Sequence, residues 1–217
     1  PLMLPAAYGM VNGYIVGPGV DLTNADLAGV DLYNANLRDA NLDGVDLSGA
    51  DLINAVLTGA TLTGANLTGA YLWSADLAGV DLTNADLSNA DLRDADLTGA
   101  NLSNANLSNA NLTDANLSNA ILTGAYLTGA DLTDANLTDA NLTNADLTDA
   151  RMTDADLSNA NLTGARMTDA DLSNANLTGA NLTDVVSGSI TGPLMLPAAY
   201  GMVNGYIVGP GVDLTNA

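Results

Sequence analysis

One position in five is a large apolar residue over most of the chain. Every fifth residue from Leu22 to Leu182 is Leu, with Met152 and Met167 as the only exceptions. Two residues before each of them stands Ala, or Val at positions 20, 30, 45 and 80, and the residue between is usually Asp or Asn. Thr or Ser, followed by Gly, Asn or Asp, completes the unit, and 33 units follow one another without a change of spacing.

A period of five fits neither of the regular secondary structures, since a helix repeats its apolar residues at about 3.6 positions and a strand at 2. The Gly, Asn, Asp and Ser of each unit are residues that form turns. The pattern therefore predicts a chain that bends every five residues and points every Leu the same way. Such a chain is a solenoid, with Leu and Ala in an axial core, polar residues in water, and Asn side chains that can stack as amide ladders.

The unit Ala-(Asp/Asn)-Leu-X-X over residues 20–184 resembles the consensus of the pentapeptide-repeat family. That resemblance implies an all-β fold, a right-handed quadrilateral β-helix with four units in each coil. Here it implies about eight coils and a rod roughly 40 Å long at ~4.8 Å per coil. The resemblance also makes Leu the central inward residue and Ala the small inward corner. The stretch VNGYIVGPG before the first unit is similar to the lead-in of cyanobacterial members.

The non-repetitive phrase at residues 1–25 occurs again, without a substitution, at residues 193–217. In both copies an Asn-Gly pair separates two short β-prone runs, which predicts hairpins from Gly9 to Val16 and from Gly201 to Val208. We expect the large side chains of these hairpin-like connectors to pack where lengths of rod meet. They are Tyr8, Met10, Tyr14, Ile15, Tyr200, Met202, Tyr206 and Ile207.

The chain thus divides into four predicted parts. They are a connector at 1–19, a solenoid at 20–184, a second connector at 185–211 and the start of a next module at 212–217. Because the first residue is Pro1 and not Met, we expect a processed chain or part of a longer protein. The repeated phrase has three interpretations: a tandem array of modules with a period of 192 residues, a capping segment copied by an engineer, or a natural duplication of two modules.

The charge of the chain is strongly negative. The net charge is −21, all 25 acidic residues are Asp, and the basic residues are Arg38, Arg93, Arg151 and Arg166. This balance argues against binding to nucleic acid or to an anionic membrane, because both require cations on the protein. The chain has no His and no Cys, and no apolar run reaches the ~20 residues of a membrane span. We therefore expect no enzyme and no cofactor, with Ca²⁺ on stacked Asp columns as a weak possibility.

A coil of twenty residues would place residues twenty apart in one column. Arg151 would then lie between Asp131 and Asp171, and Arg166 beside Asp146, which predicts local charge compensation. A cation–π contact is expected where Arg93 follows Trp73. The outward apolar residues predict a contact surface for the chain's own connector, a neighbouring rod or a foreign partner. With Arg93, this surface comprises Tyr33, Ile53, Val56, Tyr71 and Trp73, and Ile121 with Tyr126 forms a weaker one.

These patterns favour a structural role. The sequence predicts a module of a self-assembling or tandem β-solenoid filament whose partner is itself, placed outside the cell or at its surface, with the cytoplasm as the alternative. Three other interpretations stay open. They are a soluble acidic DNA mimic that inhibits gyrase, as the resemblance implies, an engineered repeat scaffold, and an ice-binding rod suggested by a rank of Thr residues twenty apart.

Overall fold

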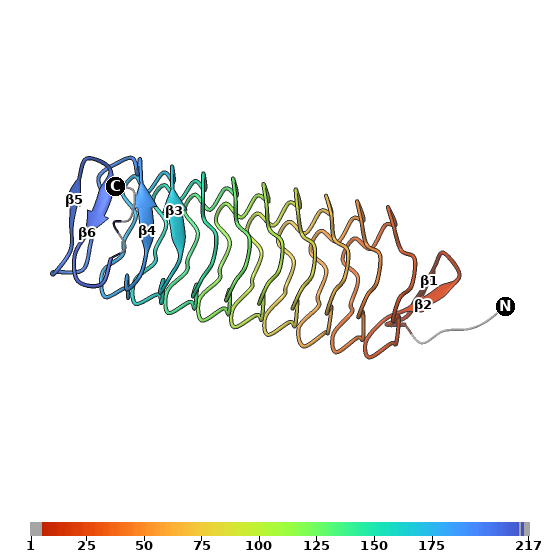
Figure 1. Ribbon diagram of the computed structural model, residues 1–217. Coiled ribbons are helices and arrows are strands. Elements are labelled where there is room, and N and C mark those ends of the chain that lie inside the picture. Colours follow the sequence, from red (N-terminus) through yellow and green to blue (C-terminus); the bar gives the residue numbers. More distant parts are fainter. Residues whose placement is uncertain (1–5, 213, 215–217) are drawn as a thin grey trace.

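The computed structural model describes residues 6–212 and 214, and in it the chain winds into a rod of stacked coils (Figure 1). Parallel bridges join residues twenty apart, from Asp21 with Asn41 to Asp171 with Thr191. Four pentapeptide units therefore lie between each bridged residue and its partner in the next coil. This register confirms that residues twenty apart form columns.

A tight turn ends every unit. In the first unit the N–H of Ala25 donates to the carbonyl of Leu22 at 2.9 Å, and Asn24 between them has a φ of 56°. A turn with a positive φ at its third residue is of the type II kind, which favours Gly or Asn there. The same left-handed conformation recurs at every fifth residue from Asn24 to Asp184. This is why the last residue of each unit is Gly, Asn or Asp, apart from Ser74.

The core is a continuous apolar column along the rod. The Leu or Met of every unit from Leu22 to Leu182 is buried, and so is nearly every Ala or Val two residues before it. Ser187 is the one buried polar side chain among the described residues. The predicted inward positions of Leu and Ala are thus confirmed.

The Asp or Asn before each Leu has a local role that the period alone does not reveal. Its side-chain oxygen accepts the N–H two residues later, as in the 3.1 Å bond from Thr23 to Asp21. This Asx geometry stabilises the turn that follows. The expected amide ladders form in two places, where Asn136 donates to Asn116 at 3.2 Å and Asn181 donates to Asn161.

Six short strands are present in the described part of the chain, and no helix. Strands β1 (Gly9–Val11) and β2 (Tyr14–Val16) form an antiparallel hairpin at one end of the rod. Strands β3 (Arg166–Thr168) and β4 (Val186–Gly188) pair in parallel. Strands β5 (Gly201–Val203) and β6 (Tyr206–Val208) form a second hairpin, and β6 lies beside β4.

Both predicted hairpins are confirmed, at opposite ends of the rod (Figure 1). The first part of the second connector continues the last coil, since Thr191 bridges to Asp171 and Met195 to Asn176. The predicted start of a next module at 212–217 falls mostly on residues outside the described part. Within that part, the structure contains no helix long and apolar enough to cross a membrane.

Candidate functional site

The aromatic column predicted on the outside of the rod is present. The N–H of Asn54 donates to the carbonyl of Trp73 at 3.0 Å, and the N–H of Ser74 donates to that of Arg93 at 2.9 Å. These bonds hold Ile53, Trp73 and Arg93 one above another in successive coils. Together with Tyr33, Val56 and Tyr71 they form the surface that we call the aromatic column.

Trp73 is fixed from two sides. The Arg93 guanidinium lies over its ring, 5.7 Å from the centroid, which confirms the predicted cation–π contact. The indole N–H donates to Asp94 Oδ2 at 2.7 Å, and Arg93 makes a bidentate ion pair with Asp91 at 2.6 and 2.8 Å. The hydrogen bond from Arg93 lowers the pKa of Asp91. The indole is thus held in one orientation before any partner arrives, through two carboxylates that the sequence analysis did not assign to the surface.

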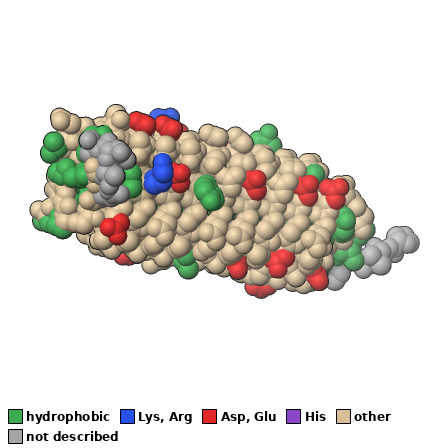
Figure 2. Space-filling model, viewed as in Figure 1, with side chains coloured by type: hydrophobic (Ala, Val, Ile, Leu, Met, Phe, Trp, Pro, Cys, Tyr) green, Lys and Arg blue, Asp and Glu red, His purple; other side chains and the backbone are tan. Residues whose placement is uncertain are grey.

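The aromatic column is open to solvent. Tyr33, Tyr71 and Trp73 are exposed, while Ile53 and Val56 are half-buried. Figure 2 shows a face on which hydrophobic side chains gather most densely at the end of the rod that carries β5 and β6, whereas acidic ones are spread along its length.

Arg151 and Arg166 lie where the columns predict. Arg151 reaches Asp131 at 3.2 Å and Arg166 reaches Asp146 at 4.0 Å. Both pairs are exposed, and such pairs contribute only ~0–1 kcal/mol. Asp26 and Asp46 bridge as expected, but no group of three or more metal-ligating acids was found among the described residues.

Hydrogen bonds hold several carboxylates in their charged form. The pKa of Asp46 is lowered, first by the backbone N–H of Ser48 and then by its hydroxyl. The pKa of Asp171 is lowered mainly by the hydroxyl of Ser173. In both cases the donor lies two residues later, so the turn geometry itself favours the anion.

The duplicated phrase folds locally in the same way at both ends. The hydroxyl of Tyr8 donates to the carbonyl of Pro18 at 3.0 Å, and that of Tyr200 donates to Pro210 at 3.0 Å. Each ring lies directly on a glycine, at 17 or 209, where any side chain would collide with it. Position 17 stands five residues before Leu22, so this contact replaces the inward leucine that the pattern would place there.

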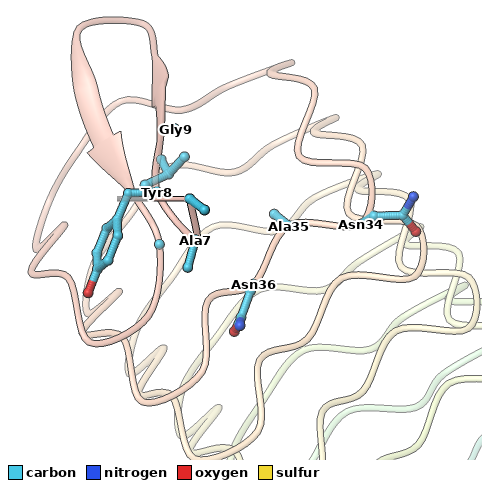
Figure 3. Close-up of a pocket in the computed structure, with 9 residues that line it drawn as sticks. Ala7, Tyr8, Gly9, Asn34, Ala35 and Asn36 are labelled. Atoms are coloured by element: carbon cyan, nitrogen blue, oxygen red, sulfur yellow. The ribbon is translucent and has the colours of Figure 1, made fainter. Parts of the chain in front are cut away.

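The first hairpin rises from the end of the rod beside a shallow hollow (Figure 3). Tyr8 and Gly9 line it from the connector, and Asn34, Ala35 and Asn36 line it from the first coils. Its walls hold no charged group, so the hollow provides apolar and amide contacts rather than acid–base chemistry. Ala35 is only partly buried, unlike the same residue in nearly every other unit.

The second hairpin is docked onto the last coil. The N–H of Ile207 donates to Ser187 Oγ at 3.0 Å, and the N–H of Ile190 donates to the carbonyl of Gly205 at 2.9 Å. Ile207 has no solvent exposure. The sequence analysis missed Ser187, although a Ser at the position normally held by Leu is a signal that could have been noticed.

The eight connector residues divide by their surroundings. Ile207 is fully buried, Tyr8, Tyr200, Met202 and Tyr206 are half-buried, and Met10, Tyr14 and Ile15 are exposed. The structure thus brings the second copy into contact with the rod more fully than the first.

Comparison with known proteins shows which family profile the repeat matches. The family profile described as pentapeptide repeats (8 copies) matches residues 18–52, 35–73, 75–114, 110–149 and 150–186. No match was found among curated proteins.

Several solved structures are similar to this chain. HetL, from the cyanobacterium Nostoc sp. strain PCC 7120 and involved in heterocyst differentiation regulation, is 34% identical over 88% of this chain and 90% of its own, with a TM-score of 0.44. A pentapeptide repeat protein from the thylakoid lumen of Arabidopsis thaliana is 46% identical over 47% of this chain and 71% of its own (TM-score 0.46). Rfr23, from the cyanobacterium Cyanothece 51142, is 31% identical over 63% of this chain and 90% of its own (TM-score 0.36).

Proposed function

The chain belongs to the pentapeptide-repeat family, and we propose that it is a structural module of a self-assembling or tandem β-solenoid filament. The architecture we propose is the right-handed quadrilateral β-helix of about eight coils. One observation carries the proposal: the phrase at 1–25 recurs at 193–217, and each copy folds into the same hairpin. A module that is followed by another of its kind repeats its entry segment where the next begins.

The mechanism of such a module is mechanical. Backbone bonds, most of them 2.7–3.0 Å long, join each coil to the next along the described rod, around a dry column of leucines. Because each coil contacts only its neighbours, stability adds up along the rod, and further modules lengthen it without a new core. We propose no enzymatic activity, because the interior is filled and the carboxylates are spread evenly over the surface.

The partner we propose is the chain itself. The net charge of −21 keeps parallel filaments apart at low ionic strength, and salt screens this repulsion. The aromatic column is our candidate for a lateral contact, since Trp73 is exposed and already ordered by Arg93 and Asp94. We place the filament outside the cell or at its surface, with the cytoplasm as the alternative.

A soluble acidic rod that mimics DNA and inhibits gyrase is the second candidate function. The observation that favours it is the net charge of −21 with only four basic residues. Inhibition of gyrase supercoiling by the purified chain would support that reading over ours.

The filament proposal is tested by electron microscopy of a two-module chain, in which residues 1–192 are followed by the complete 217-residue sequence. We expect one straight rod of about twice the single-module length. Two short rods joined at a variable angle would show that modules do not continue one another.

A further inference from the structure

Each hairpin presents two different faces. In the first hairpin Met10 pairs with Ile15 across the strands, so both point to one side, which we call the Met/Ile face. Val11 and Val16 alternate with them and point to the other side, the Val face. The second hairpin has the same register, with Met202 opposite Ile207 and Val203 and Val208 on its Val face.

In the first hairpin the Val face is the covered one. Val16 is 7% exposed, and Val11 packs against the core of the rod that follows. The Met/Ile face is open, with Met10 53% and Ile15 40% exposed. The first coil therefore packs against the Val face of the hairpin, and the Met/Ile face is exposed to solvent.

In the second hairpin the arrangement is reversed. Ile207 is 0% exposed and Met202 packs against the core of the preceding rod. Val203, by contrast, is 54% exposed, and with Val208 and Leu214 it lines an open apolar hollow. Leu214 is itself exposed, although Leu22, its counterpart in the first copy, is buried.

The two ends are therefore the two halves of one joint. We propose that the open Met/Ile face of residues 9–16 is a docking surface for residues 184–190 of a second copy of this module. This inference rests on the proposed function and names the contact that joins its modules. The structure already contains a contact of this kind, because residues 184–190 hold an identical hairpin by the same face.

Residues 184–190, which we call the seat, bind the second hairpin through specific hydrogen bonds. Ser187 Oγ accepts the N–H of Ile207, and the N–H of Asp184 donates to the carbonyl of Gly211 at 2.6 Å. Tyr206, which lies opposite Val203 on the Val face, reaches the same segment from the strand end: a Cβ on Gly188 would come within 3.1 Å of its ring. The Ile207 N–H and the Gly211 carbonyl have counterparts in the first copy, on Ile15 and Gly19.

In separate molecules the seat is occupied by the chain's own second hairpin, so association requires an exchange. Ile207→Asp should drive that exchange, because a carboxylate is disfavoured at a buried site and the second hairpin leaves the seat. The first hairpin of another molecule then takes its place. Val203→Asp is the matched control, since it adds the same charge to the same hairpin on its exposed face.

The experiment is sedimentation velocity on the full chain and its variants, with far-UV circular dichroism to verify the coils. We expect Ile207→Asp to form end-to-end oligomers of at least twice the mass of the unchanged chain, and Ile15→Asp added to it to restore that mass. Met202→Asp, on the same face, serves as an independent variant. If Ile207→Asp and Met202→Asp keep the mass of the unchanged chain, or if oligomers persist with Ile15→Asp, the inference is overturned.

The two experiments distinguish the docking surface from the filament. A continuous two-module rod together with Ile207→Asp molecules that do not associate would retain the filament and reject this docking surface. Oligomers that depend on Ile15, together with a hinged two-module chain, would retain the surface and reject the filament.

Discussion

The backbone N–H of Ile207 donates to the hydroxyl of Ser187 at 3.0 Å, and Ile207 is fully buried at that point. Ile15, its counterpart in the first copy, is exposed. One sequence thus occupies two environments in the same chain, and the difference lies in whether residues like 184–190 stand beside it.

Removing the Ser187 hydroxyl should loosen the second hairpin. Ser187→Ala leaves the Ile207 N–H buried without an acceptor, at a cost of about 1–2 kcal/mol. Amide protons of β6 should then exchange about 5- to 30-fold faster with deuterium. Ser158→Ala is the control, since the Ser158 side chain is remote from the hairpin in sequence, and it should leave those rates unchanged. Equal rates in both variants would contradict the assigned role.

The stability of the Leu column should depend on the volume and shape of each buried side chain rather than on its being leucine. Leu102→Ala opens a cavity among fully buried neighbours and should lower the free energy of unfolding by about 3–5 kcal/mol. Leu102→Met should lower it by less than about 1.5 kcal/mol, since Met152 and Met167 already fill the same position in other units. Urea denaturation compares the two variants, and equal losses would argue against a tightly packed column.

Ser74 is a strained exception to the turn rule. It has a φ of 54° where other units place Gly, Asn or Asp. Ser74→Gly removes the steric cost of the left-handed conformation, and we expect a gain of about 0.5–1 kcal/mol after the added chain entropy is subtracted. Ser88→Gly, one place earlier in a unit, should instead lower stability. A loss from both changes would contradict the assigned turn.

Protonation should weaken the rod only in strong acid. The folded pKa of Asp91 lies below its ordinary value of 3.8, chiefly because of the hydrogen bond from Arg93. The unfolded chain therefore binds this proton first, and the stability from the pair is present above pH 3.8 and lost as the pH falls further. Asp91→Asn removes that contribution. The difference in unfolding free energy between the two proteins should be constant from pH 7 to about 5 and shrink below it; a constant difference down to pH 2 would refute the argument.

The sequence predicted the parts of this fold that are set by local geometry. Period five placed Leu102 and its equivalents inside, and the Asn-Gly pairs located both hairpins. It did not indicate that Ser187 would hold Ile207, or that the faces of the two hairpins would be covered in opposite ways. Those features depend on which coil stands beside an identical segment, and neighbours of that kind are set by tertiary structure rather than by local sequence.

The junction between two covalently linked modules can be tested by the reactivity of a cysteine placed at position 203. Val203→Cys gives the chain its only thiol, at a position that is 54% exposed in a single module. In a two-module chain the same cysteine lies in the shared hairpin, followed by a complete rod, like Val11 in the first copy. We predict that its rate of alkylation falls at least tenfold there, because the Val face becomes covered. The same rate in one and two modules would contradict the claim that the duplicated phrase joins successive lengths of rod.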